Sequence, residues 1–164
     1  MNKGRMVEEA AVVFERDLPA SPEKTWAFLT EPPRLAGWYG EAAIEPLEGG
    51  KIELMGGHIR GVITGWRPHQ FLAHTWNVFQ PGETASAWPV TYLEFALEER
   101  GTTTRLTLTH RPIPTRMQPQ TMMGWHTFLD MLEAGARDEK VQSRDHYMQK
   151  NAALYSVDLN NLQG

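Results

Sequence analysis

The sequence predicts an α+β fold in which a curved antiparallel sheet wraps around a long C-terminal helix. From about residue 45 to residue 109, four segments alternate apolar and polar residues with the two-residue period of strands. After Pro114 the apolar residues recur with the period of a helix instead. Glycine and proline pairs separate the segments, as expected for the turns of an antiparallel meander.

Composition indicates one ordered domain. The 164 residues include 41% hydrophobic and 10% aromatic residues, enough to close a core. The net charge of −4 argues against nucleic acid and anionic membranes as partners. The chain has no cysteine, which excludes disulfides, thiolate metal sites and a cysteine nucleophile and leaves the cytoplasm as the expected location. Neither a signal peptide nor a membrane span is expected, because Glu8 and Glu9 interrupt the N-terminal segment and no later apolar run is long enough.

The N-terminal part predicts a strand followed by a short helix. Apolar side chains alternate over residues 12–18, with Arg16 as a polar exception on the buried face. Ser21 before Pro22 is a typical helix start, and the helix should stop before Pro32. Residues 35–40 are too short for a full helix and should form a turn that bears two aromatic side chains.

The four alternating segments place apolar side chains on one face of the sheet. Two histidines share that face with apolar neighbours, so each is expected to be a hydrogen-bonded core or rim residue more readily than an acid or base. The segments are Ile52 and Leu54; Leu72, His74 and Trp76; Leu93, Phe95 and Leu97; and Leu106, Leu108 and His110.

Residues 119–138 predict the long amphipathic helix. Its polar half holds His126, Thr127, Asp130, Glu133 and Ala134. Its apolar half holds Met122, Trp125, Phe128, Leu129, Met131, Leu132 and Ala136. Gly124 and Gly135 also lie in the apolar half and each costs about 1 kcal/mol of helix propensity relative to alanine, so we expect a strand or a ligand to approach closely at both.

We expect residues 1–140 to form the domain and residues 141–164 a C-terminal extension with a weaker helical pattern. The extension could pack on its own domain or on a second copy of the chain in a homodimer. The sequence leaves this choice open.

Five segments together resemble the activators of heat-shock-protein-ninety ATPase and their bacterial homologues, within the START and polyketide-cyclase-like superfamily. They span most of residues 12–136. They are SPEKTWAFLTEPPRLAGWYG at 21–40, the glycines 49 and 50 before KIEL, GVITGWRPHQFLAHTW at 61–76, TRLTLTH at 104–110 and GWHTFLDML at 124–132.

The resemblance implies the helix-grip (START-like) fold, with a cavity between the sheet and the last helix that takes a small apolar molecule. It implies no fixed chemistry, because members of the superfamily bind lipids, hormones or polyketides and a few are cyclases or hydrolases. Function therefore has to be argued from the site.

The histidines do not predict a metal centre, and no cofactor is expected. None of the six forms an HExxH or His-x-His pair, and the carboxylates lack ligand spacing around them. GxSxG is also absent. The glycines of residues 56–61 lack the lysine of a phosphate loop and predict a turn between strands.

The aromatic residues point to the space beneath the long helix. Trp26 and Trp125 should pack helix against sheet, whereas Trp38 and Trp76 suit a cavity wall and a filled core equally well. The leading hypothesis is therefore binding of a small apolar or aromatic ligand in that cavity. Its predicted binding residues are Trp38, His74, Trp76, Phe95, His110, Trp125, Phe128 and Leu129.

Two alternatives remain. The same cavity could serve a cyclase or hydrolase in which His74 or His110 moves protons. The chain could also act on a chaperone partner, although it lacks the second domain that the eukaryotic activators possess.

Overall fold

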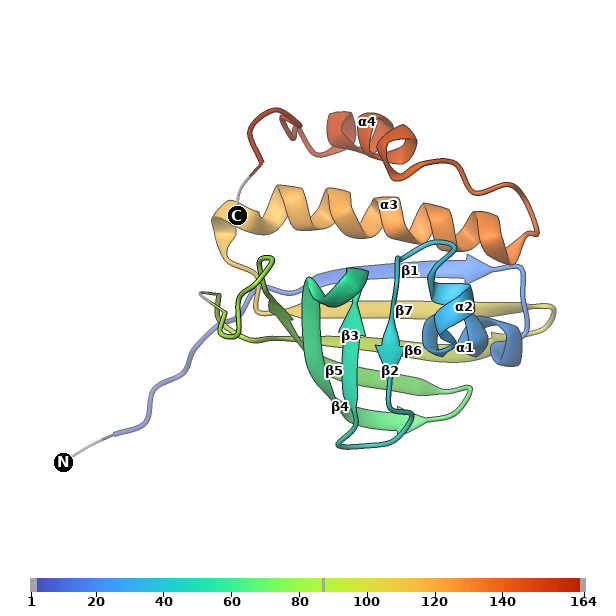
Figure 1. The fold of residues 1–164 in the computed structure, drawn as a ribbon, viewed down its shortest axis with the longest axis horizontal. Helices are drawn as coiled ribbons and strands as arrows, with labels where there is room; N and C mark the ends of the chain where they lie inside the picture. Colours follow the sequence, from blue (N-terminus) through green and yellow to red (C-terminus); the bar gives the residue numbers. More distant parts are fainter. Residues whose placement is uncertain (1–2, 87, 163–164) are drawn as a thin grey trace.

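The computed structural model describes residues 3–86 and 88–162. A curved seven-stranded sheet has the order β1-β7-β6-β5-β4-β3-β2, and every neighbouring pair is antiparallel (Figure 1). The strands are β1 (Val12–Leu18), β2 (Ala43–Ile44), β3 (Lys51–Leu54), β4 (Ile59–Arg67), β5 (Phe71–Val78), β6 (Thr91–Arg100) and β7 (Thr103–Arg111). The predicted α+β fold with its antiparallel meander is confirmed.

Two short helices link the first two strands. Helix α1 (Pro22–Thr30) begins as expected, with the Ser21 side chain accepting a hydrogen bond from the backbone of Lys24. It ends before Pro32, where a second proline-led helix, α2 (Pro32–Leu35), starts. Trp38 and Tyr39 follow it in a turn, and both side chains are buried.

Alternation identified five of the seven strands but not β2 or β4 individually. Strand β2 has only two residues, too few to show a period. In β4 the register shifts between Ile63 and Gly65, so the alternation breaks along the strand. Residues 55–57 form a 3-10 turn between β3 and β4, which confirms the start of the expected turn, but residues 59–61 belong to β4 instead.

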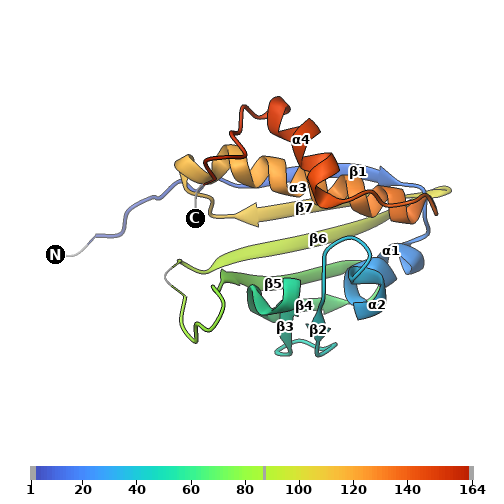
Figure 2. The same cartoon turned by 45° about the horizontal axis from the view of Figure 1, so that its top comes forward.

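Helix α3 (Gln118–Ala136) lies along the sheet, and α4 (Arg144–Leu154) covers the opposite side of α3 (Figure 2). This arrangement corrects the prediction for the polar half of α3, because Thr127 and Ala134 are buried rather than exposed. Asn151 of α4 donates a hydrogen bond to the Thr127 hydroxyl (3.2 Å). The predicted extension is therefore packed on its own domain over residues 141–162. Its last two residues, 163 and 164, lie outside the described residues.

Arg16 explains why a charge interrupts the apolar face of β1. Its guanidinium donates to Asp130 (3.0 Å) and to Glu133 (3.3 Å), both on α3. Asp130 also accepts from Asn151 (3.0 Å). The three elements β1, α3 and α4 thus share one partly buried ionic network.

The two glycines of α3 have different surroundings. An added Cβ at Gly135 would lie 3.1 Å from the Phe28 ring, so a close approach exists there, but it comes from helix α1 and not from the expected strand or ligand. At Gly124 nothing lies within 4 Å of an added Cβ, and the expected close neighbour is absent from the described residues.

None of the helices in the described residues is long and apolar enough to cross a bilayer.

Gly124→Ala should stabilise the protein by about 0.5–1 kcal/mol, because it adds helix propensity without a clash. Gly135→Ala should give no gain, since the same benefit is offset by displacement of the buried Phe28 ring. Chemical denaturation of the two variants checks both expectations. Equal stabilisation by both would contradict the close contact at Gly135.

Candidate functional site

Aromatic side chains fill the space between the sheet and α3. Tyr39 stacks on Phe128 with ring centroids 4.7 Å apart, and Trp125 lies 5.3 Å from Trp76. The Trp38 indole donates a hydrogen bond to the Phe28 carbonyl (2.9 Å), which fixes that ring in the core. The void that remains between Tyr39, His74 and their apolar neighbours measures about 10 Å³, about the volume one water needs.

The open space lies elsewhere than expected. Of the eight predicted binding residues, six are buried in the core and lie outside the lining of the main pocket: Trp38, His74, Phe95, Trp125, Phe128 and Leu129. Trp76 and His110 do line a pocket of about 680 Å³. That volume is in the range of small-molecule sites.

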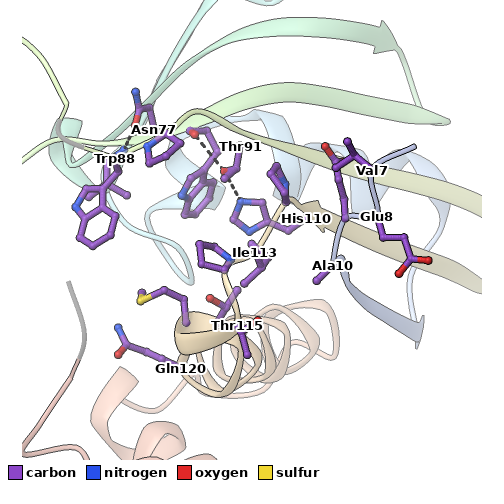
Figure 3. Close-up of a pocket in the computed structure, with 18 of the residues that line it drawn as sticks. Val7, Glu8, Ala10, Asn77, Trp88, Thr91, His110, Ile113, Thr115 and Gln120 are labelled. Carbon is purple, nitrogen blue, oxygen red and sulfur yellow. Dashed lines mark hydrogen bonds between the residues drawn. The ribbon is translucent and has the colours of Figure 1, made fainter. Parts of the chain in front are cut away.

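This pocket opens at the end of the sheet beside the start of α3 (Figure 3). Four parts of the chain form it: residues 7–10 before β1, His58 in the turn before β4, residues 76–78 and 88–91 on the two sides of the β5–β6 loop, and residues 110–121. The apolar lining residues are Val7, Ala10, Trp76, Val78, Trp88, Pro89, Pro112, Ile113, Pro114 and Met117. The polar ones are Glu8, Glu9, His58, Asn77, Thr91, His110, Thr115, Gln120 and Thr121.

His110 connects the pocket to the aromatic core through hydrogen bonds at both ring nitrogens. The Trp125 indole N–H donates to Nδ1 (3.0 Å), so Nε2 carries the proton and donates to the Thr91 hydroxyl (2.7 Å). Thr91 in turn donates to the Trp76 carbonyl (3.2 Å; Figure 3 shows the His110–Thr91 bond). The imidazole is therefore held neutral, with no nitrogen available for a ligand.

Burial keeps both core histidines uncharged. Desolvation lowers the pKa of His110 to about 3, with a further contribution from the nearby His74. Desolvation also lowers the pKa of His74 to about 4, against a hydrogen bond to the Thr75 carbonyl (2.7 Å) that acts in the opposite direction. Both side chains therefore satisfy the core-histidine expectation.

The sequence reasoning missed His58, which it placed in a turn without a role. Its Nδ1 lies 2.9 Å from the Phe79 carbonyl, which can only accept, so Nδ1 carries the proton. The Phe79 backbone N–H donates to the His58 carbonyl (2.7 Å), so the two residues are joined twice. Nothing in the local sequence indicates that this turn meets the end of β5.

Trp88 was also missed as a lining residue. It lies in the β5–β6 loop, where the sequence has no period to assign its direction. The Arg116 guanidinium stacks over its ring at 5.2 Å, which links the loop to the segment before α3.

Among the described residues, no cluster of three or more histidine and carboxylate side chains could hold a metal ion.

Comparisons with known proteins agree with this fold. The family described as "Activator of Hsp90 ATPase homolog 1-like protein" matches residues 19–136. A search of curated protein sequences gave no match.

The solved structures that are similar to this chain include the following three. CalU16 from Micromonospora echinospora has a TM-score of 0.71 and 24% identity over 89% of this chain and 86% of its own. An HSP90 activator from Plasmodium falciparum has a TM-score of 0.66 and 21% identity over 76% and 94%. The Aha1 dimer from Colwellia psychrerythraea has a TM-score of 0.62 and 22% identity over 77% and 96%. At these identities the likeness establishes the fold.

Proposed function

Because the chain belongs to the family of Activator of Hsp90 ATPase homolog 1-like proteins, we propose that it binds a small apolar or aromatic molecule in the pocket at the end of the sheet. The observation that carries this proposal is a 680 Å³ pocket with two indoles in an otherwise closely packed domain. The void of about 10 Å³ beside Tyr39 and His74 is too small for such a ligand.

The composition of the pocket supports a binding role. Its lining is mostly apolar, so a ligand would gain from burial of its own apolar surface at about 25 cal/mol per Å² before entropy losses. Trp76 and Trp88 offer flat aromatic surfaces on elements that are fixed by the sheet and by the Arg116 stack. Binding and not turnover is the role that this arrangement favours.

An enzyme that uses His74 or His110 as its base has less support. Both nitrogens of His110 are occupied within the protein, and His74 is enclosed in the core away from the pocket. General base catalysis needs a nitrogen within reach of a substrate proton. Turnover that is lost in His110→Ala while the fold is intact would restore this alternative.

A chaperone partner and a homodimer remain hypotheses, as does a cytoplasmic location. The names of the Plasmodium and Colwellia proteins describe an activator and a dimer, and those properties belong to those proteins. A native pull-down that recovers a chaperone, and the mass of the protein in solution with and without residues 141–164, test the two partners.

Trp88→Ala should weaken binding of the neutral dye Nile red by at least about fivefold, because it removes an aromatic wall of the pocket. The measurement is a fluorescence titration at constant protein concentration.

Tyr92→Ala is the matched control for Trp88→Ala. Like Trp88, Tyr92 is an aromatic residue under an arginine, with Arg111 5.5 Å from its ring, but it is exposed and does not line the pocket. Its substitution should leave the affinity for the dye unchanged. No binding by the parent protein, or equal losses in both variants, would refute the proposed site.

A further inference from the structure

His58 is the pocket imidazole with a free ring nitrogen. Its Nδ1–H donates to the Phe79 carbonyl, so in the neutral imidazole the Nε2 lone pair can only accept a hydrogen bond. Nε2 has no partner among residues 3–86 and 88–162. The other pocket imidazole, His110, has both nitrogens bonded within the protein.

The position of His58 is fixed before any ligand arrives. Its side chain and its backbone carbonyl both bind Phe79, at 2.9 and 2.7 Å. Arg60 at the start of β4 stacks over the Phe79 ring at 4.4 Å and donates to the Gly57 carbonyl (2.9 Å). A preorganised acceptor of this kind loses little freedom when a ligand donates to it.

The other polar groups of the lining discriminate less. The hydroxyls of Thr115 and Thr121 can rotate to donate or to accept. Thr91 is already committed to the Trp76 carbonyl, and the Asn77 side-chain oxygen accepts from the Val78 backbone (3.0 Å). His58 therefore differs from these groups, because its free Nε2 can only accept a hydrogen bond.

The charges around the pocket disfavour an anion. No lysine or arginine belongs to the lining among the described residues, and Arg116 lies over Trp88 instead. The nearby Arg111 is directed to Glu9 (3.5 Å). Glu8 lies at the rim, with its side chain away from His110 (Figure 3). A carboxylate or phosphate ligand would lose its hydration without gaining a cation.

We infer that the ligand is an uncharged aromatic molecule with a hydrogen-bond donor, such as a phenol, that stacks near Trp76 and Trp88 and donates to Nε2 of His58. This inference rests on the proposed function, since it names the ligand class of the same pocket.

Three probes of similar size test the inference by calorimetric titration at pH 8: 2-naphthol, 2-methoxynaphthalene and 2-naphthoate. One added hydrogen bond should make 2-naphthol bind about five- to tenfold more tightly than its methyl ether. The anionic naphthoate should bind at least about tenfold more weakly than 2-naphthol. Indole N–H resonances of Trp76 and Trp88, followed by NMR, locate the bound probe.

Variants of His58 assign the effect to one nitrogen. In His58→Leu the preference for 2-naphthol over its methyl ether should fall to about onefold. His58→Gln, which keeps an acceptor, should recover part of the preference. His146→Leu, an exposed histidine on α4 outside the lining, should behave as the parent.

The outcomes separate the two proposals. Equal affinity of the parent for 2-naphthol and its ether, retention of the preference in a folded His58→Leu protein, or naphthoate as the tightest probe would overturn the ligand class and leave the binding site standing. If no probe binds, or if the Trp76 and Trp88 resonances do not move, the proposed function fails as well.

Discussion

Trp125→Ala should lower the free energy of unfolding by about 3–5 kcal/mol, the largest loss expected from a single substitution in this protein. The side chain is 3% exposed, and its ring lies within 6.2 Å, between centroids, of Tyr39, Trp76, Phe95 and Phe128. Removal leaves a cavity in the centre of the aromatic cluster, which the surrounding strands cannot collapse to fill. Urea denaturation followed by circular dichroism measures the loss.

Trp125→Phe separates packing from hydrogen bonding. It keeps a ring in the cluster but removes the donor to Nδ1 of His110, which is then buried without a partner, at a cost of about 1–3 kcal/mol. Trp88→Ala at the pocket should cost less than about 1 kcal/mol, because that tryptophan is only partly buried. A loss below about 1 kcal/mol for Trp125→Ala would contradict the central place of this residue in the core.

Stability should fall steeply between pH 7 and pH 5. The folded protein holds His74 and His110 neutral, with pKa values of about 4 and about 3, whereas in the unfolded chain both regain the ordinary pKa of 6.5. Below pH 6.5 the two histidines are therefore protonated in the unfolded chain but remain neutral in the folded protein. Each histidine contributes stability that is present above pH 6.5 and is lost as the pH falls toward its folded pKa, at up to about 1.4 kcal/mol per pH unit. Together the two histidines should lower the free energy of unfolding by about 4 kcal/mol between pH 7 and pH 5.

Denaturation curves at several pH values measure this slope. His110→Gln should lower stability at pH 7 because it disturbs the bonds to Trp125 and Thr91, but it should also remove about half of the slope between pH 6 and pH 5. His74→Gln should reduce the slope to a similar extent. A parent protein whose stability is constant over this range would show that the two histidines are accessible to protons in the folded state.

The bonds of His110 also explain why the pocket has a defined shape. The residue reaches from Trp125 in the core to Thr91 and, through it, to the Trp76 carbonyl. Substitutions in the core are therefore expected to move the floor of the pocket, so binding should be compared only among variants that retain the parent's unfolding midpoint. His58 lies in the turn before β4, and Trp88 lies in the β5–β6 loop. Both can be changed without breaking the hydrogen bonds of His110.

Sequence reasoning alone established the fold class, most of the strands, the start of α1 and the long C-terminal helix. These features follow from the order of apolar and polar residues along one segment, because strand and helix periods fix which side of the backbone each residue occupies. The same rule placed His74 and His110 correctly on the inner face. It failed for Thr127 because the side of α3 that looked solvent-facing is covered by α4, an interaction between separate segments.

Only the tertiary structure decided how much space remained beneath α3 and where the pocket opened. A void is the small difference between the volume that the elements enclose and the volume of the side chains within it, and neither quantity is local. Trp38, Tyr39, Trp125 and Phe128 together leave almost no space in the core. The pocket instead forms where four stretches meet at one end of the sheet, and their meeting depends on the curvature of the sheet and the packing of α3, which no single segment encodes.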